Sequence, residues 1–319
     1  MREIGILEVG GFQVGQAQDL EAATGLTVIL CDRCSPCGVD IRGGGPASRE
    51  TPLLDPRAAS TGIHALVLSG GSAFGLDAAG GVMRYLEERD IGFDVGVAKV
   101  PLVCQSCVFD LAIGRKEIRP DAQMAYAACE AASRTYMQEG CVGVGTGCTV
   151  GKCCGAEFAM KSGVGSYAVE VGDMRVGAIV GVNAMGDVFD VDTGEQIAGL
   201  RTADGRGLRA SEAELYRQME QGQAVTNTTI GAIVTNVRLD KAQMGKVAAM
   251  AHNGFARTIR PVHTSMDGDS IYALSVGDAE GSPDAVGTLA AYVMGKAVNR
   301  AVYTAHAMCG LPAVCDLEK

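Results

Sequence analysis

The sequence contains no tryptophan, and Phe and Tyr bring the aromatic content of its 319 residues to only 5%. Few aromatic side chains are therefore available as stacking platforms for single-stranded nucleic acid. The net charge of −10, without a basic stripe, also argues against a nucleic-acid partner. No apolar run reaches the ~18 residues of a membrane-spanning helix. Because the first residues also lack the basic-then-apolar layout of a signal peptide, we expect a cytoplasmic protein that binds neither membrane nor nucleic acid.

Glycine and apolar residues are abundant instead. Hydrophobic residues make up 47% of the chain, which allows a large core in one large domain or two modest ones. The 44 glycines are spread along the sequence, so tight strand-to-helix turns are expected. Helical periodicity and β-branched runs alternate, which predicts sheets enclosed between helices. The expected helices cover Leu76–Arg89, Asp121–Gln138, Lys241–Ala256 and Asp284–Met308, with a polar helix-forming linker over Arg201–Gln223.

Twelve cysteines raise the question of disulfides or metals. Without an export signal, thiols in a reducing compartment are favoured over a disulfide framework. Two clusters have spacings that also occur in metal sites, namely Cys31, Cys34 and Cys37, and Cys104 with Cys107. The first cluster lacks a fourth ligand at the usual spacing, and no His pair accompanies the second. Buried or loop thiols are therefore the favoured interpretation, and a metal or redox role is the alternative.

An Asn-Thr pair precedes one apolar, β-branched run. Thr228 begins the expected strand and Asn227 lies directly before it. A cut between the two residues would give Thr228 a free α-amine beside its own hydroxyl. Such an amine titrates near ~7.7–8.0, so its neutral form can act as general base for that hydroxyl. The alternative is that Asn-Thr-Thr is only a polar entry to a strand.

A glycine-rich turn, Ser69–Gly75, lies between the expected strand His64–Leu68 and the first helix. Backbone N–H groups and a helix N-terminus meet there, which suits an anion or a developing oxyanion. The turn is neither a Walker loop nor G-x-S-x-G, so Ser72 is a poor nucleophile candidate. It serves either close strand–helix packing or a substrate-pocket wall, and the second role would involve Gly71, Ser72 and Phe74.

Three further polar positions have both a structural and a chemical interpretation. Lys152 lies at the end of the Gly-rich stretch that begins at Gly143. A lysine in such a loop can be a phosphate ligand, a cation that stabilises a transition state, or a solvated surface charge. Asn183 ends the expected strand Arg175–Val182, where it caps a turn or holds an oxyanion. The pair Asp267 and Asp269 precedes another strand, where it forms a simple turn or orients an ammonium group. Residues 186–190, which follow the strand expected at Arg175–Val182, are predicted to form a hairpin turn and a return strand.

Five motifs occur in order: Ser69–Leu76 (SGGSAFGL), Gly145–Lys152, Gly181-Val182-Asn183, Asn227-Thr228-Thr229-Ile230 and His263-Thr264-x-x-Asp267-Gly268-Asp269. Together they resemble the L-aminopeptidase/D-esterase family, which also holds β-peptidyl aminopeptidases and endo-type nylon-oligomer hydrolases. The resemblance covers nearly the whole chain, including Arg42-Gly43-Gly44 and Arg49-Glu50-Thr51. Aminopeptidase members usually carry Ser as nucleophile, so the Asn-Thr pair looks closest to the nylon-oligomer hydrolase branch.

The resemblance implies an α/β (α+β) fold, a four-layer αββα sandwich like that of N-terminal-nucleophile hydrolases but with different connectivity. It implies a single hydrolase domain over 1–319 that cuts itself between Asn227 and Thr228 into chains 1–227 and 228–319. It implies peptide, amino-acid amide or oligoamide substrates, homo-oligomers that are often tetramers, and no metal or organic cofactor.

The resemblance also assigns roles to individual residues. Thr228 matches the nucleophile, and Asn183 matches the residue that stabilises the oxyanion. Lys152 is the best match for the active-site lysine, with Lys161 as competitor. Asp267 and Asp269 match carboxylates near the new amine. The three-Cys cluster and Cys153-Cys154 depart from the family, and two rival hypotheses remain: an uncut, non-catalytic relative that binds a small molecule or partner, and a Cys-cluster metal or redox protein.

Overall fold

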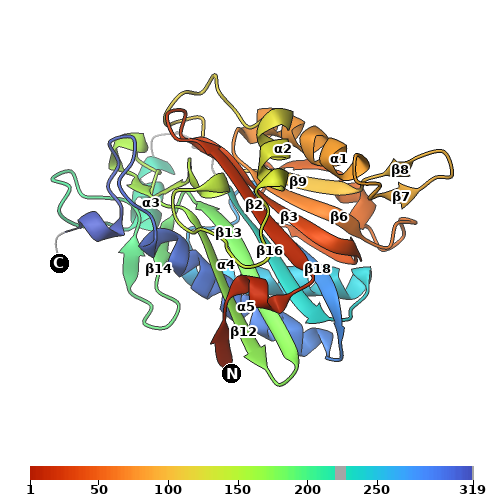
Figure 1. Cartoon of the computed structure of the whole chain (residues 1–319). Coiled ribbons are helices and arrows are strands. Elements are labelled where there is room, and N and C mark those ends of the chain that lie inside the picture. The colour runs from red at the N-terminus through yellow and green to blue at the C-terminus, as the bar shows by residue number, and fades with distance from the viewer. Residues whose placement is uncertain (220–227, 318–319) are drawn as a thin grey trace.

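Two large β-sheets lie face to face in the computed structural model, which describes residues 1–219 and 228–317 (Figure 1). The six-stranded sheet has the order β1 (Arg2–Ile4), β12 (Val164–Val171), β13 (Met174–Asn183), β16 (Thr228–Val237), β18 (Ser270–Ala279), β4 (Cys37–Ile41). The five-stranded sheet has the order β2 (Phe12–Asp19), β3 (Thr24–Ser35), β6 (Ile63–Ser69), β9 (Val103–Cys107), β5 (Ala47–Arg49). Most neighbours are antiparallel, but β16 with β18 and β6 with β9 run parallel.

Helices cover the outer face of each sheet (Figure 1). The helices α1 (Ala79–Glu87) and α2 (Ala122–Glu130) pack on the five-stranded sheet. The helices α4 (Lys241–Thr258) and α5 (Pro283–Tyr303) pack on the six-stranded sheet and on each other. The result is the four-layer αββα arrangement that the family resemblance implied.

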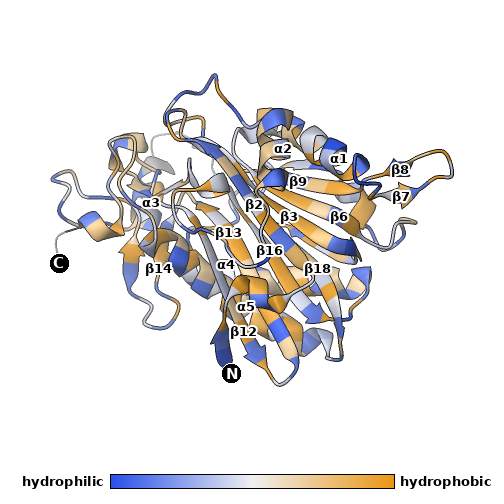
Figure 2. Cartoon of the chain, in the orientation of Figure 1, coloured by the Kyte–Doolittle hydropathy of each residue, from blue (hydrophilic) through white to orange (hydrophobic). Residues whose placement is uncertain are grey.

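Strands with two buried faces explain the continuous apolar runs of the sequence. Along β3, Ile29 points into the core between the sheets, whereas Val28 and Leu30 point toward α1 and α2. Along β16, Ala232 points to the inter-sheet core and Ile233 to the helices α4 and α5. Figure 2 shows the central strands as largely hydrophobic along their length.

Several expected elements have different bounds. The helix expected from Leu76 begins instead as a 3-10 helix, η3 (Ser72–Ala78), before α1. The helix expected over Asp121–Gln138 ends at Glu130, because the following chain pairs with the edge of β2, where the Ser133 N–H donates to the Val14 carbonyl. The last helix ends at Tyr303 rather than at Met308.

The linker expected over residues 201–223 becomes a helix only as α3 (Ser211–Met219), and its last residues lie outside the described parts. The prediction of a hairpin at residues 186–190 was wrong. The strand β14 (Asp187–Phe189) does not return along β13. It is the middle strand of a separate small sheet, between β15 (Gln196–Ala198) and β17 (Ile259–Arg260). Two further small sheets pair β7 (Phe93–Asp94) with β8 (Lys99–Val100), and β10 (Thr149–Val150) with β11 (Met160–Lys161).

The cysteines of the two clusters are thiols carried by strands of the two sheets. Cys31 and Cys34 lie on β3, Cys37 lies on β4, and Cys104 and Cys107 lie on β9. Within residues 1–219 and 228–317, no three His, Cys, Asp or Glu side chains are grouped so that they could hold a metal ion. The metal hypothesis therefore has no ligand set in the described parts of the chain.

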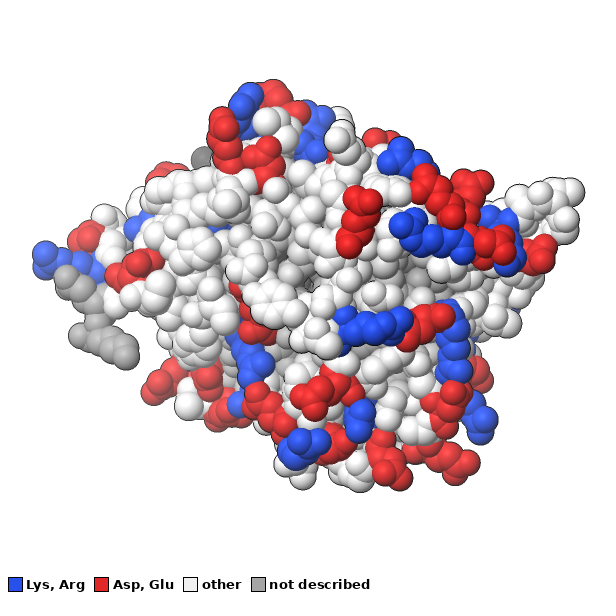
Figure 3. All heavy atoms as spheres, in the orientation of Figure 1, with Lys and Arg blue, Asp and Glu red and all other residues white. Residues whose placement is uncertain are grey.

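Charges of both signs are interspersed on the face drawn in Figure 3, with no basic stripe on that face. Of the helices in the described parts, none combines the length and the hydropathy needed to cross a bilayer.

Candidate active site

Two strand ends bring Thr228 and Asn183 together. Asn183 is the last residue of β13 and Thr228 is the first of β16, and the antiparallel register pairs them directly. Both residues are buried. Parallel pairing of β16 with β18 aligns Ile230 with Ser270, which places the turn before β18 at the same end of the sheet. Residues from three distant parts of the sequence therefore meet at one edge.

Lys152 contacts the side chain of Asn183. Its Nζ donates to Asn183 Oδ1 at 2.7 Å and to the Asn183 carbonyl at 3.1 Å. The Thr149 N–H donates to the same Oδ1 at 3.0 Å. The Asn183 Nδ2 donates to the Phe109 carbonyl at 2.7 Å, which uses one of its two N–H groups. These bonds fix the orientation of the Asn183 amide.

Burial shifts the protonation of Lys152. It lowers the pKa of the ammonium group to about 7, while the charges of Asp267 and Asp110 act in the opposite direction. A lysine with such a pKa exists in both protonation states near neutral pH, which is a property of lysines used in catalysis.

Lys161, the competing candidate, is fully buried and has a different set of partners. Its Nζ donates to the carbonyls of Cys148 at 2.7 Å and Ser162 at 2.9 Å. Burial lowers its pKa as well. Lys161 thus stabilises the loop that carries Lys152 by binding its backbone carbonyls. Lys152, not Lys161, donates a hydrogen bond to Asn183.

The turn before β18 holds the two carboxylates by separate networks. Asp269 Oδ1 accepts from the Thr229 N–H at 2.7 Å, and Oδ2 accepts from Nδ1 of His263 at 2.9 Å. Asp267 Oδ2 accepts from the N–H and hydroxyl of Thr264 at 2.8 and 2.6 Å. Burial raises the pKa of Asp267, and the charge of Asp269 raises it further.

Glycines allow this turn to approach the nucleophile candidate. A Cβ added to Gly268 would lie 2.9 Å from Thr228 Oγ1, closer than real Cβ atoms come. A Cβ on Gly43 would lie 2.3 Å from the Asp267 carbonyl oxygen. The backbone N–H of Gly45 donates to that same oxygen at 2.7 Å. The Arg42-Gly43-Gly44 motif therefore supports the Asp267–Asp269 turn.

Sequence reasoning missed Asp110, which follows β9. This carboxylate is almost fully buried and accepts from the Thr24 hydroxyl at 2.6 Å and the Gly71 N–H at 2.7 Å. Burial raises its pKa, whereas its hydrogen bonds and the charge of Lys152 lower it. The one signal in the sequence was a lone Asp after an apolar strand, which is too common to be informative.

The three residues of the predicted pocket wall have different surroundings. Gly71 is bound to Asp110, and Ser72 has a left-handed φ of 51° with its N–H on the Val108 carbonyl. Phe74 is 59% exposed, with the Arg119 guanidinium 3.9 Å from its ring centroid. Gly71 thus binds Asp110, the carboxylate whose charge acts on Lys152, whereas Phe74 faces solvent. Asn227 lies outside the described residues.

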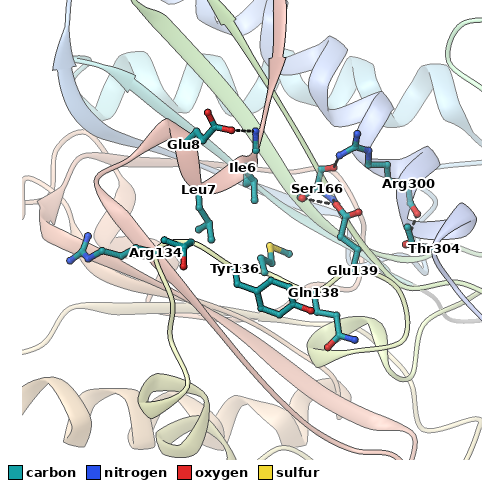
Figure 4. A pocket seen from close by; sticks show the side chains of 13 residues that line it. Ile6, Leu7, Glu8, Arg134, Tyr136, Gln138, Glu139, Ser166, Arg300 and Thr304 are labelled. Carbon is teal, nitrogen blue, oxygen red and sulfur yellow. Dashed lines mark hydrogen bonds between the residues drawn. The ribbon is translucent and has the colours of Figure 1, made fainter.

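A separate cavity of about 650 Å³ lies elsewhere in the molecule (Figure 4). The 3-10 helix η1 (Ile6–Val9), residues 134–139 and the end of α5 line it. Glu139 accepts there from the Ser166 hydroxyl at 2.6 Å. None of the predicted site residues lines this cavity, so it is distinct from the Thr228 site.

The layers and the sheet topology define an α/β protein with a four-layer αββα fold. Among solved structures, the L-aminopeptidase D-Ala-esterase/amidase of Ochrobactrum anthropi, described as a variant of the N-terminal-nucleophile hydrolase fold, aligns with a TM-score of 0.73. The alignment covers 96% of this chain and 88% of that one at 19% identity. A β-aminopeptidase of Burkholderia sp. aligns with a TM-score of 0.68 at 19% identity, over 98% and 91% of the two chains.

The sequence matches Peptidase family S58 over residues 5–314, and the chain belongs to this family. An "Uncharacterized aminopeptidase" of Mycobacterium leprae is 37% identical, over 98% of this chain and 93% of the relative. A 6-aminohexanoate-oligomer endohydrolase of Agromyces sp. is 31% identical, over 88% and 77%. The chain is therefore a hydrolase of a peptidase family, as the motifs had indicated.

Proposed function

We propose that this chain is a self-processing amide hydrolase whose nucleophile is Thr228. The observation that carries the proposal is the pairing of Thr228 with Asn183 at the buried end of two strands. Lys152 holds the Asn183 amide, and Asp269 holds the N–H of the residue that follows Thr228. A hydroxyl, an amide donor, a titratable lysine and a carboxylate are thus collected in one place.

The first reaction is the cut between Asn227 and Thr228. The Thr228 hydroxyl attacks the Asn227 carbonyl carbon, the C–N bond breaks, and the nitrogen leaves as the α-amine of Thr228. Water then hydrolyses the resulting ester, which restores the hydroxyl and frees the Asn227 carboxylate. The products are chains 1–227 and 228–319, which stay together in one domain. No metal or organic cofactor is needed for these steps.

The second reaction uses the same hydroxyl on a substrate amide or ester. The new Thr228 amine accepts the hydroxyl proton and passes it to the leaving amine or alcohol, and an acyl ester forms on Thr228. Water then hydrolyses this ester, which releases the carboxylic acid and restores the hydroxyl. An N–H of Asn183 stabilises the oxyanion. Lys152 orients Asn183 and keeps the pKa of the amine low by its charge, and Asp267 and Asp269 hold the amine in place.

The substrate class in this proposal is a small peptide, an amino-acid amide or an oligoamide. Relatives named for aminopeptidase activity and for 6-aminohexanoate-oligomer hydrolysis support these alternatives. Gly71, Ser72 and Phe74 would form part of the pocket wall. Hydrolysis of a peptide with a free N-terminus, compared with the same peptide acetylated, separates removal of terminal residues from internal cleavage.

We also propose a cytoplasmic protein that assembles as a homo-oligomer, with a tetramer of the cleaved pair as the expected form. Light scattering of the purified protein coupled to gel filtration measures the assembly. A mass equal to one 32.9 kDa chain would contradict it.

The deciding experiment is the intact mass of the purified protein under denaturing conditions. We expect two chains whose masses sum to that of the 32.9 kDa precursor plus one water, the smaller one beginning with Thr228. Thr228→Ala should remain one chain without hydrolytic activity, whereas Thr228→Ser should still be cut. A wild-type chain that stays intact after long incubation would instead support a non-catalytic relative that binds a ligand.

A further inference from the structure

His263 is connected to the nucleophile strand through a single carboxylate. The ring Nδ1 of His263 lies 2.9 Å from Asp269 Oδ2, and the backbone N–H of His263 donates to the same oxygen at 3.0 Å. The other oxygen, Oδ1, accepts from the N–H of Thr229 at 2.7 Å. One buried carboxylate therefore joins the imidazole to the residue directly after Thr228.

The hydrogen bond also determines which ring nitrogen carries the proton. A carboxylate oxygen only accepts, so Nδ1 must be the donor. In the neutral ring Nε2 is then a bare acceptor, and it is buried without a hydrogen-bond partner among the described residues. The ring thus makes one directed side-chain hydrogen bond, and that bond is to Asp269.

The His263 ring is held on its other side by α4. The ring of His252 packs against it with centroids 4.7 Å apart at 71°, and His252 itself is buried with Nε2 3.0 Å from the Asp40 carbonyl oxygen. The Phe255 ring lies 6.3 Å away. Packing on this scale restricts the ring to the orientation in which Nδ1 faces Asp269.

The backbone of His263 adopts an unfavourable conformation that is compatible with this ring orientation. Its φ is +62°, in the left-handed region that non-glycine residues seldom adopt. Residues are held in such conformations only where their surroundings fix them, and they cluster at functional sites. The conformation allows the backbone N–H and the ring Nδ1 to reach the same carboxylate oxygen.

We propose that His263 is a positioning residue for the nucleophile, acting through Asp269. Its two donors fix the Asp269 carboxylate in one rotamer, so that Oδ1 holds the Thr229 N–H and thereby the direction of Thr228 at the strand end. Without the ring donor, the carboxylate can rotate and the start of β16 loses a constraint. The inference rests on the proposed role of Thr228 as nucleophile.

Three substitutions separate the ring donor from the backbone strain. His263→Asn places an amide N–H near the position of Nδ1 and tolerates a positive φ. His263→Gly removes the donor but suits the backbone better than any other residue. His306→Asn, at an exposed histidine away from the site, is the matched control.

We expect kcat of His263→Gly to fall roughly 10- to 100-fold with little change in KM, because a small misplacement of reacting groups has that effect. His263→Asn should recover most of the loss, and His306→Asn should match wild type. Wild-type kcat in His263→Gly, or an Asn variant no better than the Gly variant, overturns the proposal.

A measurement in the uncut chain distinguishes this inference from the proposed function. In a Thr228→Ala background, hydrogen exchange of the amides at the start of β16 should be faster with His263→Gly and unchanged with His263→Asn. Equal exchange in both refutes the positioning role, whether or not the wild-type protein hydrolyses amides. An inactive wild type with the expected exchange pattern would overturn only the hydrolase assignment.

Discussion

Replacement of Lys152 by Met tests whether the lysine loses its proton on folding. The pKa of this ammonium group falls from 10.5 to about 7 because it is buried. Between these two values the unfolded chain keeps the proton and the folded chain does not. The folded state therefore gains stability as pH rises through this window, by about 1.4 kcal/mol for each pH unit. Methionine fills similar space and does not titrate.

The assay is urea unfolding of two single chains that both carry Thr228→Ala, one with Lys152 and one with Lys152→Met. The difference in their free energies of unfolding should move in favour of the lysine chain by about 2 kcal/mol from pH 7 to pH 9, because half of the folded lysines still carry the proton at pH 7. Both chains contain the same cysteines, so thiol titration cancels in the difference. Lys246→Met, at an exposed position of α4, is the control and should give a flat difference.

A flat difference for Lys152→Met would refute the reasoning. It would mean that the ammonium group stays charged in the folded protein, as at a solvated surface site. The bond to Asn183 would then be an ordinary ion–amide contact, and the conclusion that burial lowers the pKa of Lys152 to about 7 would fail. A difference of opposite sign would mean that folding stabilises the charged form.

Three further predictions concern other residues of the site. Asn183→Ala should lower kcat about 10²- to 10³-fold, the usual effect of losing an oxyanion donor, and wild-type kinetics would contradict that role. Gly268→Ala should stop chain cutting, as seen by intact mass, because the new Cβ would lie 2.9 Å from Thr228 Oγ1; normal cutting would show that the turn can move away. Asp110→Asn should fold normally, since an amide can accept from Gly71 and donate to Thr24. It also removes a charge that raises the pKa of Lys152, so the stability increase described above should begin at lower pH.

The assignment of the elements shows where local sequence was sufficient. The strands around Leu26–Leu30, His64–Leu68 and Ile271–Val276 were predicted from β-branched and apolar runs, and the structure confirms them. Helix ends were predicted less well. The chain after Glu130 has helical composition, but hydrogen bonds to β2 are more favourable there than another helical turn. This competition depends on a distant strand, so the end of the helix cannot be predicted from the neighbouring sequence alone.

The sequence by itself determined the family, the αββα class and the order of the motifs, because residue types and spacings carry that information directly. It also singled out Thr228 and Asn183 as chemical candidates. Only the tertiary structure placed Lys152 rather than Lys161 on Asn183, and only it linked Asp110 and His263 to the same site. Whether a buried amine or carboxylate belongs to a site depends on strand register and on which backbone groups surround it. These are set by contacts between segments as distant in the sequence as Gly45 and Asp267, so local sequence could not reveal them.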